Sequence, residues 1–395
     1  MSPSKIRFSE LVGEQTRAEI FATVLTAGPI SRTQLAQRLG LVPSSVTRML
    51  PPLLEHGYLR EAEDTAPQGR GRPQKMLHVN PDKHIVVGMK IGPAQVSGVV
   101  TDMAAANVLA RDEEPIADCT PQTALSAAAA LTSRLLSTAP EAADRVLGLG
   151  VGVSGHVDST AGVCRYSALL DWNKVDVAGP LQEATGLPVV VNNDVNTLVV
   201  AERWFGEGRD IDSFAVVTVG PGIGSGLLLN GSLFSGATGL AGELGHMPLD
   251  PAGPMCSCGR RGCLEALAGD RAVLRHLQDA GFACASIDEA ITLARSGTAA
   301  ARGVALAAFT EAGNALGRGL AGMCNLLNLQ KIILAGEGAV AYDLFGPALT
   351  QALEAHAFST AARDCQIHVD PVQHDLWARG AACLVIRDTV GATLS

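Results

Sequence analysis

Residues 239–265 read GLAGELGHMPLDPAGPMCSCGRRGCLE. In this stretch His246 precedes Cys256, Cys258 and Cys263, with nine residues between the histidine and the first cysteine. Three thiolates and one imidazole fill the tetrahedral shell of a structural zinc site, which leaves no open position for water. The loop is rich in glycine and proline, so metal binding could fold it in place of a hydrophobic core. We predict a structural Zn²⁺ ion on these four residues; the alternative is a reactive surface loop of reduced cysteines.

The composition of the whole chain is that of a globular protein. Of its 395 residues, 47% are hydrophobic, 17% are charged and 43 are glycine, which excludes a disordered chain, a coiled coil and a small disulfide-stapled fold. Nine cysteines, an odd number, also argue against a disulfide framework. No apolar run reaches the roughly 18 residues that span a bilayer, and the N-terminal MSPSKIRFSE has no apolar core like that of a secretory signal. We expect a cytoplasmic protein with no membrane insertion.

Charge divides the chain into two parts. Residues 1–83 carry 11 Lys and Arg against 8 Asp and Glu, a net charge of +3, whereas residues 84–395 carry 19 against 31, a net charge of −12. A mildly basic head on an acidic body suggests that the two parts have separate partners.

The basic head has the pattern of a helix-turn-helix motif. A helix over residues 14–27 ends at Gly28-Pro29, a second begins at Ser31 with Gln34 at capping-box spacing, and a third begins at Pro43. The third helix would enter the major groove of DNA. Its candidate DNA contacts are Ser44, Ser45, Thr47 and Arg48. The alternative is a plain helical hairpin whose polar face is merely solvated.

Two short extended runs follow, around residues 57–60 and 75–79. The glycine- and arginine-rich loop between them carries Arg70 and Arg72, which would suit the minor groove of DNA. These runs predict a β-hairpin wing, and the alternative is a linker. Pro51-Pro52 falls inside the third helix and predicts a kink or a restart near Leu50.

The acidic body alternates strands with helices, which is the pattern of an α/β fold. Polar residues directly after a strand lie where open α/β sheets bind ligands. The expected strands cover residues 85–92, 95–102, 145–153, 189–194, 214–219 and 331–335.

The run 239–246, followed by Cys-x-Cys-Gly-x-x-Gly-Cys-Leu-Glu at 256–265, strongly resembles the ROK family of repressors, open reading frames and sugar kinases. The resemblance extends over residues 84–395 and, with the head, points to the NagC/Mlc/XylR-type repressors. It implies an N-terminal winged helix-turn-helix followed by an actin-like (ribonuclease H-like) two-lobed α/β body. The expected domains are a head with linker over 1–83 and a body over 84–395. The smaller lobe would cover about 84–197 plus the C-terminal segment, and the larger lobe, with the zinc loop, about 198–380.

The resemblance also implies a monosaccharide between the lobes. Carried over by motif, the sugar-contacting positions are Asn193, Asp194, Glu243, His246 and Glu265. Their chemistry agrees, because the amide donates and accepts while the carboxylates accept hydrogen bonds from hydroxyls. His246 can bind zinc through one ring nitrogen and donate to a hydroxyl from the other. The alternative for each acidic residue is a solvated loop or a helix cap.

Three loops depart from the family's kinases. Their Asp-x-Gly-Gly-Thr phosphate loop is Lys90-Ile91-Gly92-Pro93-Ala94 here, and their Gly-Thr-Gly segment is Gly220-Pro221-Gly222. Proline removes a backbone N–H that could hold phosphate, and the hydroxyls are lost too. The third segment, residues 335–338, carries Glu337 where nucleotide phosphates would approach. Asp194, the kinases' base position, is retained.

These departures predict a sugar-responsive regulator of carbohydrate metabolism, most simply a repressor, with no catalytic residue. It would bind operator DNA and a monosaccharide or sugar-phosphate effector, as a homodimer or homotetramer. One alternative is an ATP-dependent sugar kinase with an appended DNA-binding head. Another is a DNA-binding protein that responds to a protein partner.

Overall fold

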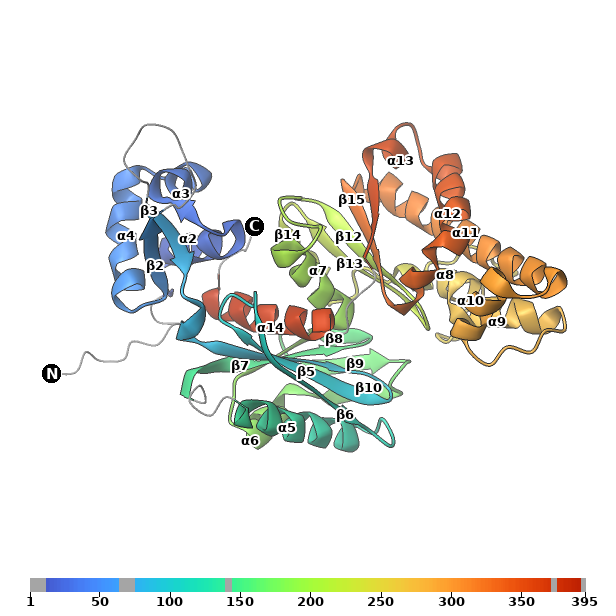
Figure 1. The fold of residues 1–395 in the computed structure, drawn as a ribbon, viewed down its shortest axis with the longest axis horizontal. Coiled ribbons are helices and arrows are strands. Elements are labelled where there is room, and N and C mark those ends of the chain that lie inside the picture. The colour runs from blue at the N-terminus through green and yellow to red at the C-terminus, as the bar shows by residue number, and fades with distance from the viewer. Residues whose placement is uncertain (1–11, 64–74, 139–143, 371–374, 392–395) are drawn as a thin grey trace. The chain divides into compact units, whose positions relative to one another are not determined.

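A computed structural model describes residues 12–63, 75–138, 144–370 and 375–391. The chain forms two compact units, one of residues 1–204 with 375–395 and the other of residues 205–374 (Figure 1). The predicted division into a head and a two-lobed body, with its boundaries, stays a prediction.

The head contains three helices and a small sheet. The helices are α2 (Gln15–Ala27), α3 (Arg32–Arg38) and α4 (Pro43–Glu55). The antiparallel strands, in the order β1-β3-β2, are β1 (Ile30–Ser31), β3 (Lys75–Val79) and β2 (Leu59–Glu63). Ser31 caps α3 in a full capping box with Gln34, and Pro43 begins α4, as predicted. The pairing of β2 with β3 makes the predicted hairpin, and the loop between them lies outside the described residues.

Helix α4 continues through Pro51 and Pro52, so the predicted restart near Leu50 is wrong, while the kink stays a prediction. The two prolines cost backbone hydrogen bonds. Pro51 is exposed and Pro52 is half-buried, whereas the opposite face of the helix buries Val46, Leu50 and Leu53 completely. Burying three large aliphatic side chains contributes about 1.5–3 kcal/mol each, a total comparable with the cost of about 3 kcal/mol for each proline.

The rest of the first unit is built around a five-stranded sheet in the order β11-β7-β4-β5-β6. Its strands are β4 (Ile85–Ile91), β5 (Gln95–Asp102), β6 (Val108–Pro115), β7 (Val146–Val153) and β11 (Val189–Asn193). A three-stranded sheet contains β8 (His156–Asp158), β9 (Val163–Ser167) and β10 (Trp172–Asp176). The helices are η1 (Pro81–Lys83), α5 (Pro121–Ser137), α6 (Ala178–Thr185), α7 (Asp194–Phe205) and α14 (Asp375–Val390).

The second unit repeats the topology of that sheet. Its order is β14-β13-β12-β15-β16, and in both sheets a meander of three antiparallel strands continues into two parallel ones. The strands are β12 (Phe214–Val219), β13 (Ile223–Leu229), β14 (Ser232–Leu233), β15 (Lys331–Ala335) and β16 (Gln366–Val369). The helices are η3 (Leu244–His246), α8 (Leu264–Ala268), α9 (Asp270–Asp279), α10 (Ile287–Ser296), α11 (Ala299–Leu327), η4 (Glu337–Ala341), α12 (Tyr342–His356) and α13 (Ala361–Asp364).

Every strand that the sequence predicts is present in the described residues. The two sheets of like topology are those of the expected actin-like body. None of the helices in the described residues is both long enough and apolar enough to cross a membrane.

The two faces of the first sheet are packed differently. Alternate residues of β4 and β7, such as Met89 and Val151, face an aliphatic core shared with α5 and α6. On the other face lies α14, and there the strands carry glycine (Figure 1). A Cβ on Gly88 would lie 1.9 Å from the carbonyl oxygen of Ala378, and one on Gly150 would lie 1.9 Å from that of Ala381. The backbone of α14 therefore rests directly on the backbones of β4 and β7.

We expect Gly150→Ala to lower the free energy of unfolding by about 3 kcal/mol, the upper end of the usual cost of overpacking, because the carbonyl it would strike is backbone and cannot rotate away. The matched control is Gly303→Ala in α11, where a Cβ meets nothing within 4 Å. That substitution should stabilise the helix by about 0.5–1 kcal/mol. Thermal denaturation of both variants measures the contrast, and a Gly150→Ala protein that melts with the wild type contradicts the close packing.

Candidate functional site

The loop that carries the three cysteines is shaped by backbone contacts. The isolated bridges Pro248–Cys263 and Met255–Arg261 fold it back on itself. Gly262 has a φ of 64°, and a Cβ there would lie 1.5 Å from the carbonyl oxygen of Asp250. Only glycine fits at such a position. These contacts fold the loop so that the three thiol groups lie close together.

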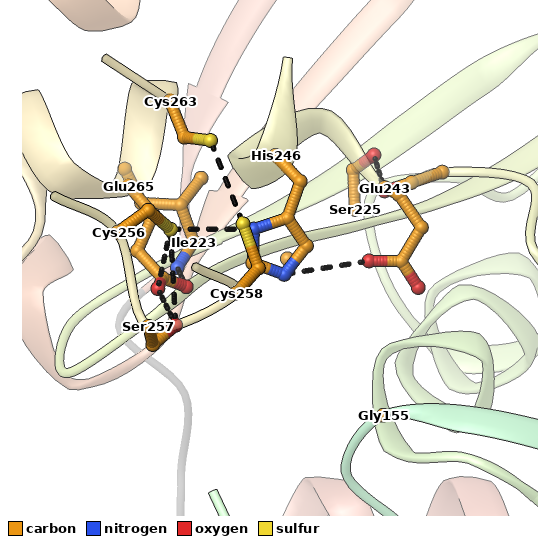
Figure 2. Close-up of polar contacts among 12 residues, drawn as sticks. Gly155, Ile223, Ser225, Glu243, His246, Cys256, Ser257, Cys258, Cys263 and Glu265 are labelled. Atoms are coloured by element: carbon orange, nitrogen blue, oxygen red, sulfur yellow. Dashed lines mark hydrogen bonds and ion pairs between the residues drawn. The ribbon is translucent and has the colours of Figure 1, made fainter. Parts of the chain in front are cut away.

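The structure brings the four predicted metal ligands together (Figure 2). The ligand atoms of His246, Cys256, Cys258 and Cys263 all lie within 4.8 Å of one another. The Sγ atoms of Cys258 and Cys263 are 3.7 Å apart, and Sγ of Cys256 is 3.6 Å from Nδ1 of His246. Tetrahedral zinc with Zn–S of about 2.3 Å and Zn–N of about 2.05 Å needs separations of about 3.8 and 3.6 Å. The cluster can hold a metal ion of that size.

The chemistry of the thiols agrees with a cation. Burial, together with the neighbouring thiols, raises the pKa of Cys263 to about 12. At that pKa the Cys263 thiol keeps its proton at neutral pH, whereas a bound metal ion would stabilise the thiolate and displace the proton.

His246 points its two ring nitrogens at different partners. Nδ1 faces Cys256, while Nε2 lies 3.9 Å from a carboxylate oxygen of Glu243 (Figure 2). Glu243 precedes η3, and its side chain is 42% exposed. The turn before it is held by a hydrogen bond of 2.7 Å from Ser225 Oγ to the carbonyl oxygen of Gly242. The imidazole can therefore bind a metal through Nδ1 and present Nε2, beside a carboxylate, to a ligand.

Glu265 lies in the first turn of α8 and already has three protein partners, one of which is Sγ of Cys256 at 3.7 Å. One carboxylate oxygen accepts a hydrogen bond of 2.7 Å from Ser257 Oγ, and the other accepts one of 3.4 Å from the backbone N–H of Ile223 (Figure 2). These contacts tie the cysteine loop and α8 to strand β13. The side chain is thus a bracing residue of the metal loop, and its role toward a sugar stays a prediction.

Asn193 and Asp194 lie in the first unit, at the junction of β11 and α7. Asn193 Oδ1 accepts from the backbone N–H groups of Val195 and Asn196, and its Nδ2 donates to the carbonyl oxygen of Gly155. This is a helix-cap arrangement, an alternative that the sequence raises only for the acidic residues. The other three predicted sugar-contacting residues lie in the second unit, and a shared sugar site stays a prediction.

Asp194 has a partner that sequence reasoning missed. Its Oδ1 accepts from the backbone N–H of Val195 at 3.0 Å, and its Oδ2 lies 3.8 Å from Nζ of Lys90. The ammonium group also lies over the ring of Trp377, 3.4 Å from its centroid. In the sequence, Lys90 stands out only because it replaces the aspartate of the kinases' phosphate loop. Its contact with Asp194 follows from the strand register, which pairs Lys90 with Gly152 and Gly152 with Asn192.

Two of the segments that differ from the kinases' phosphate loops, residues 220–222 and 335–338, lie in the second unit and against each other. Glu337 Oε2 is 3.1 Å from the place that a Cβ on Gly220 would occupy. The backbone N–H of Asp270 donates to the carbonyl oxygen of Gly220 at 3.0 Å. Burial first, and then the charges of Glu337 and Asp288, raise the pKa of Asp270 to about 6. Negative groups therefore gather beside the loop that would hold phosphate.

The candidate DNA-binding residues occupy the first turns of α4. Ser44, Thr47 and Arg48 are exposed, Ser45 is half-buried, and Thr47 donates to the carbonyl oxygen of Pro43 at 3.0 Å. The remaining two, Arg70 and Arg72, lie outside the described residues.

Comparison with known families covers both parts of the chain. The model of the ROK family matches residues 86–388, and that of the IclR helix-turn-helix domain matches residues 19–63.

Curated relatives match over nearly the full length. The DNA-binding transcriptional dual regulator NagC of Escherichia coli (strain K12) is 28% identical over 390 residues, covering 98% of this chain and 95% of the relative. The xylose repressor of Caldicellulosiruptor bescii is 27% identical over 387 residues, covering 93% and 94%. A crystal structure of a ROK family transcriptional regulator, a homologue of the Escherichia coli Mlc protein, superposes with a TM-score of 0.82 at 24% identity, covering 97% and 98%. The last shows the shared fold.

For the metal centre, we expect the purified protein to carry about one zinc ion per chain and Cys258→Ser to lose both zinc and thermal stability, because one ligand of four is removed. The matched control is Cys284→Ser, since Cys284 lies in the same unit outside the cluster. Elemental analysis and thermal denaturation, with and without a chelator, measure both quantities. Unchanged metal content in Cys258→Ser would end this assignment.

Proposed function

The chain belongs to the ROK family, and we propose that it is a sugar-responsive transcriptional regulator, acting as a repressor that binds operator DNA through its head and a monosaccharide through its body. The observation that carries the proposal is the joining of a helix-turn-helix domain and a ROK body in one chain. Relatives named as a xylose repressor and a DNA-binding regulator match across both parts, which supports it.

Recognition of DNA rests on α4. Its buried face anchors the helix in the head, which leaves Ser44, Thr47 and Arg48 on the exposed face. Hydroxyl groups allow a close approach to base edges, and arginine binds guanine or phosphate. Arg70 and Arg72 of the wing would add minor-groove contacts. Palindromic operators would require a homodimer or a homotetramer, and a DNA-binding protein of this kind would act in the cytoplasm.

Recognition of a sugar rests on polar side chains at the carboxyl ends of strands. Asn193 is the last residue of β11 and Asp194 is the first residue of α7, where open α/β sheets place their ligands. Glu243, His246 and Glu265 would complete the set from the second unit. We assign zinc a structural role on His246, Cys256, Cys258 and Cys263. When bound, it would fix the ring of His246 so that Nε2 meets a sugar hydroxyl.

We also propose that the protein binds its sugar without phosphorylating it. Glu337 stands against Gly220, so nucleotide phosphates approaching this loop would meet a carboxylate. Asp270 and its acidic neighbours add to that repulsion. In the first unit, the ammonium group of Lys90 lies 3.8 Å from Asp194, which occupies the position of the kinases' base.

The retained aspartate favours one other function, that of an ATP-dependent sugar kinase with a DNA-binding head. We expect a coupled assay of ADP release to show no turnover above background with D-glucose, D-xylose or N-acetyl-D-glucosamine, because phosphate-binding groups are lost. Sugar-dependent ADP release that disappears in Asp194→Asn would establish the kinase instead.

For the DNA-binding head, duplexes selected from a random library by the wild-type protein provide the probe. We expect Arg48→Ala to weaken binding of the selected duplex by about fivefold to 150-fold, through loss of a base or phosphate contact. The matched control is Arg302→Ala, an exposed arginine of α11. Fluorescence anisotropy measures both affinities. Equal affinity of Arg48→Ala and wild type, or selection of no duplex at all, refutes DNA recognition through α4.

A further inference from the structure

Lys90 reaches Asp194 because the strand between them has no side chain. Lys90 on β4 is in register with Gly152 on β7, which is in register with Asn192 on β11. Residues in register on neighbouring strands point to the same face of a sheet. A Cβ on Gly152 would already lie 3.2 Å from Thr197 Cγ2 and 3.5 Å from Asp194 Cα. The glycine leaves the lysine a path across β7 to the start of α7.

The ammonium group is held in place from the side of α14. Nζ lies 3.4 Å from the centroid of the Trp377 ring, a cation–π contact that is worth more when it is shielded from water. Trp377 is buried, and its own backbone carbonyl accepts a hydrogen bond of 3.1 Å from Thr197 Oγ1. The lysine is therefore a fixed, partly shielded donor whose side chain keeps 20% of its surface exposed.

The distance between the two charged groups suits a bridging oxygen. Nζ of Lys90 and Oδ2 of Asp194 are 3.8 Å apart, which is too long for a direct hydrogen bond of about 2.7–3.2 Å. Two hydrogen bonds of about 2.8 Å that meet near a right angle at one oxygen span about 4 Å. A hydroxyl in that position would accept from the ammonium and donate to the carboxylate, and a hydroxyl can do both at once.

The charge balance of the pair selects against an anion. Lys90 and Asp194 together carry no net charge. An anionic ligand on the ammonium would compete with Asp194 and bring a second negative charge close to its carboxylate, whose side chain is only 9% exposed. Like charges repel each other strongly in such a shielded place. A neutral hydroxyl keeps both charges paired.

We propose that Lys90 is a specificity-determining residue of the sugar site: with Asp194 it forms a donor–acceptor pair that binds one hydroxyl of a neutral sugar and disfavours an anionic one. This inference rests on the proposed binding of a monosaccharide. It adds a residue of opposite charge to a site whose other predicted contacts are an amide, an imidazole and carboxylates.

The test is isothermal titration of the full-length protein. The probes are D-xylose, D-glucose and N-acetyl-D-glucosamine, the 6-phosphates of the last two, and the monodeoxy analogues of whichever neutral sugar binds. We expect a neutral sugar to bind more tightly than its phosphate, and one deoxy analogue to bind wild type about tenfold to 100-fold more weakly than its parent. Lys90→Met should bind the parent sugar more weakly than wild type by a similar factor. It should bind that deoxy analogue with the same affinity as wild type does.

Two further variants keep the outcome readable. Asp194→Asn and the double variant Lys90→Met/Asp194→Asn both lack the carboxylate at position 194. Comparing these two variants therefore tests Lys90 even if Lys90→Met alone proves unstable. The double variant should bind the parent sugar at least about tenfold more weakly than Asp194→Asn. Lys174→Met, at an exposed lysine of the same unit, is the matched control and should bind as wild type does.

Each contrary result has a distinct meaning. If wild type binds a neutral sugar and the Lys90 variants bind it equally well, the role of Lys90 is overturned while the sugar-binding function stands. Tighter binding of a 6-phosphate that depends on Lys90 shows an anion-binding lysine and overturns the selectivity. If wild type binds none of the probes, both the proposed sugar response and the inference fall.

Discussion

The close contact of α14 with β4 and β7 is the constraint on which the first unit depends. It exists because Gly88 and Gly150 have no side chain, and a third glycine, Gly380, extends it to α7. A Cβ on Gly380 would lie 2.1 Å from the carbonyl oxygen of Thr197. The chain leaves the first unit at the end of α7 and returns at the start of α14, so both connections to the second unit begin at helices locked to each other and to the sheet. The same contact sets Trp377 over Lys90.

The proposed function requires a body that binds a sugar without phosphorylating it, and two contacts support that proposal. Asp194, at the carboxyl end of the sheet, lies beside Lys90, and Gly220 faces the carboxylate of Glu337. Binding energy that is not used for chemistry remains available to shift a conformational equilibrium, provided that the sugar binds two states of the protein with different affinity.

Much of the fold could be predicted from the sequence because its signals are local. The Ser31–Gln34 capping box, the strand periodicity and the spacing of His246 with the three cysteines each depend on neighbours in the chain. The continuous helix α4 could not be predicted in this way. It depends on the burial of Val46, Leu50 and Leu53 against the rest of the head, which is a tertiary effect that opposes the two prolines. The Lys90–Asp194 pair was missed for the same reason: it depends on the register of three strands and on a helix from the far end of the chain.

The central claim is that a sugar bound by the body changes the affinity of the head for DNA. The most direct measurement is the fluorescence anisotropy of a labelled duplex, selected by the protein from a random library, titrated with protein in the absence and presence of a saturating neutral monosaccharide. Coupling free energies between sites are typically 1–3 kcal/mol, so the account predicts that the sugar weakens DNA binding by about fivefold to 150-fold. An affinity for DNA that stays the same with the sugar bound would contradict it.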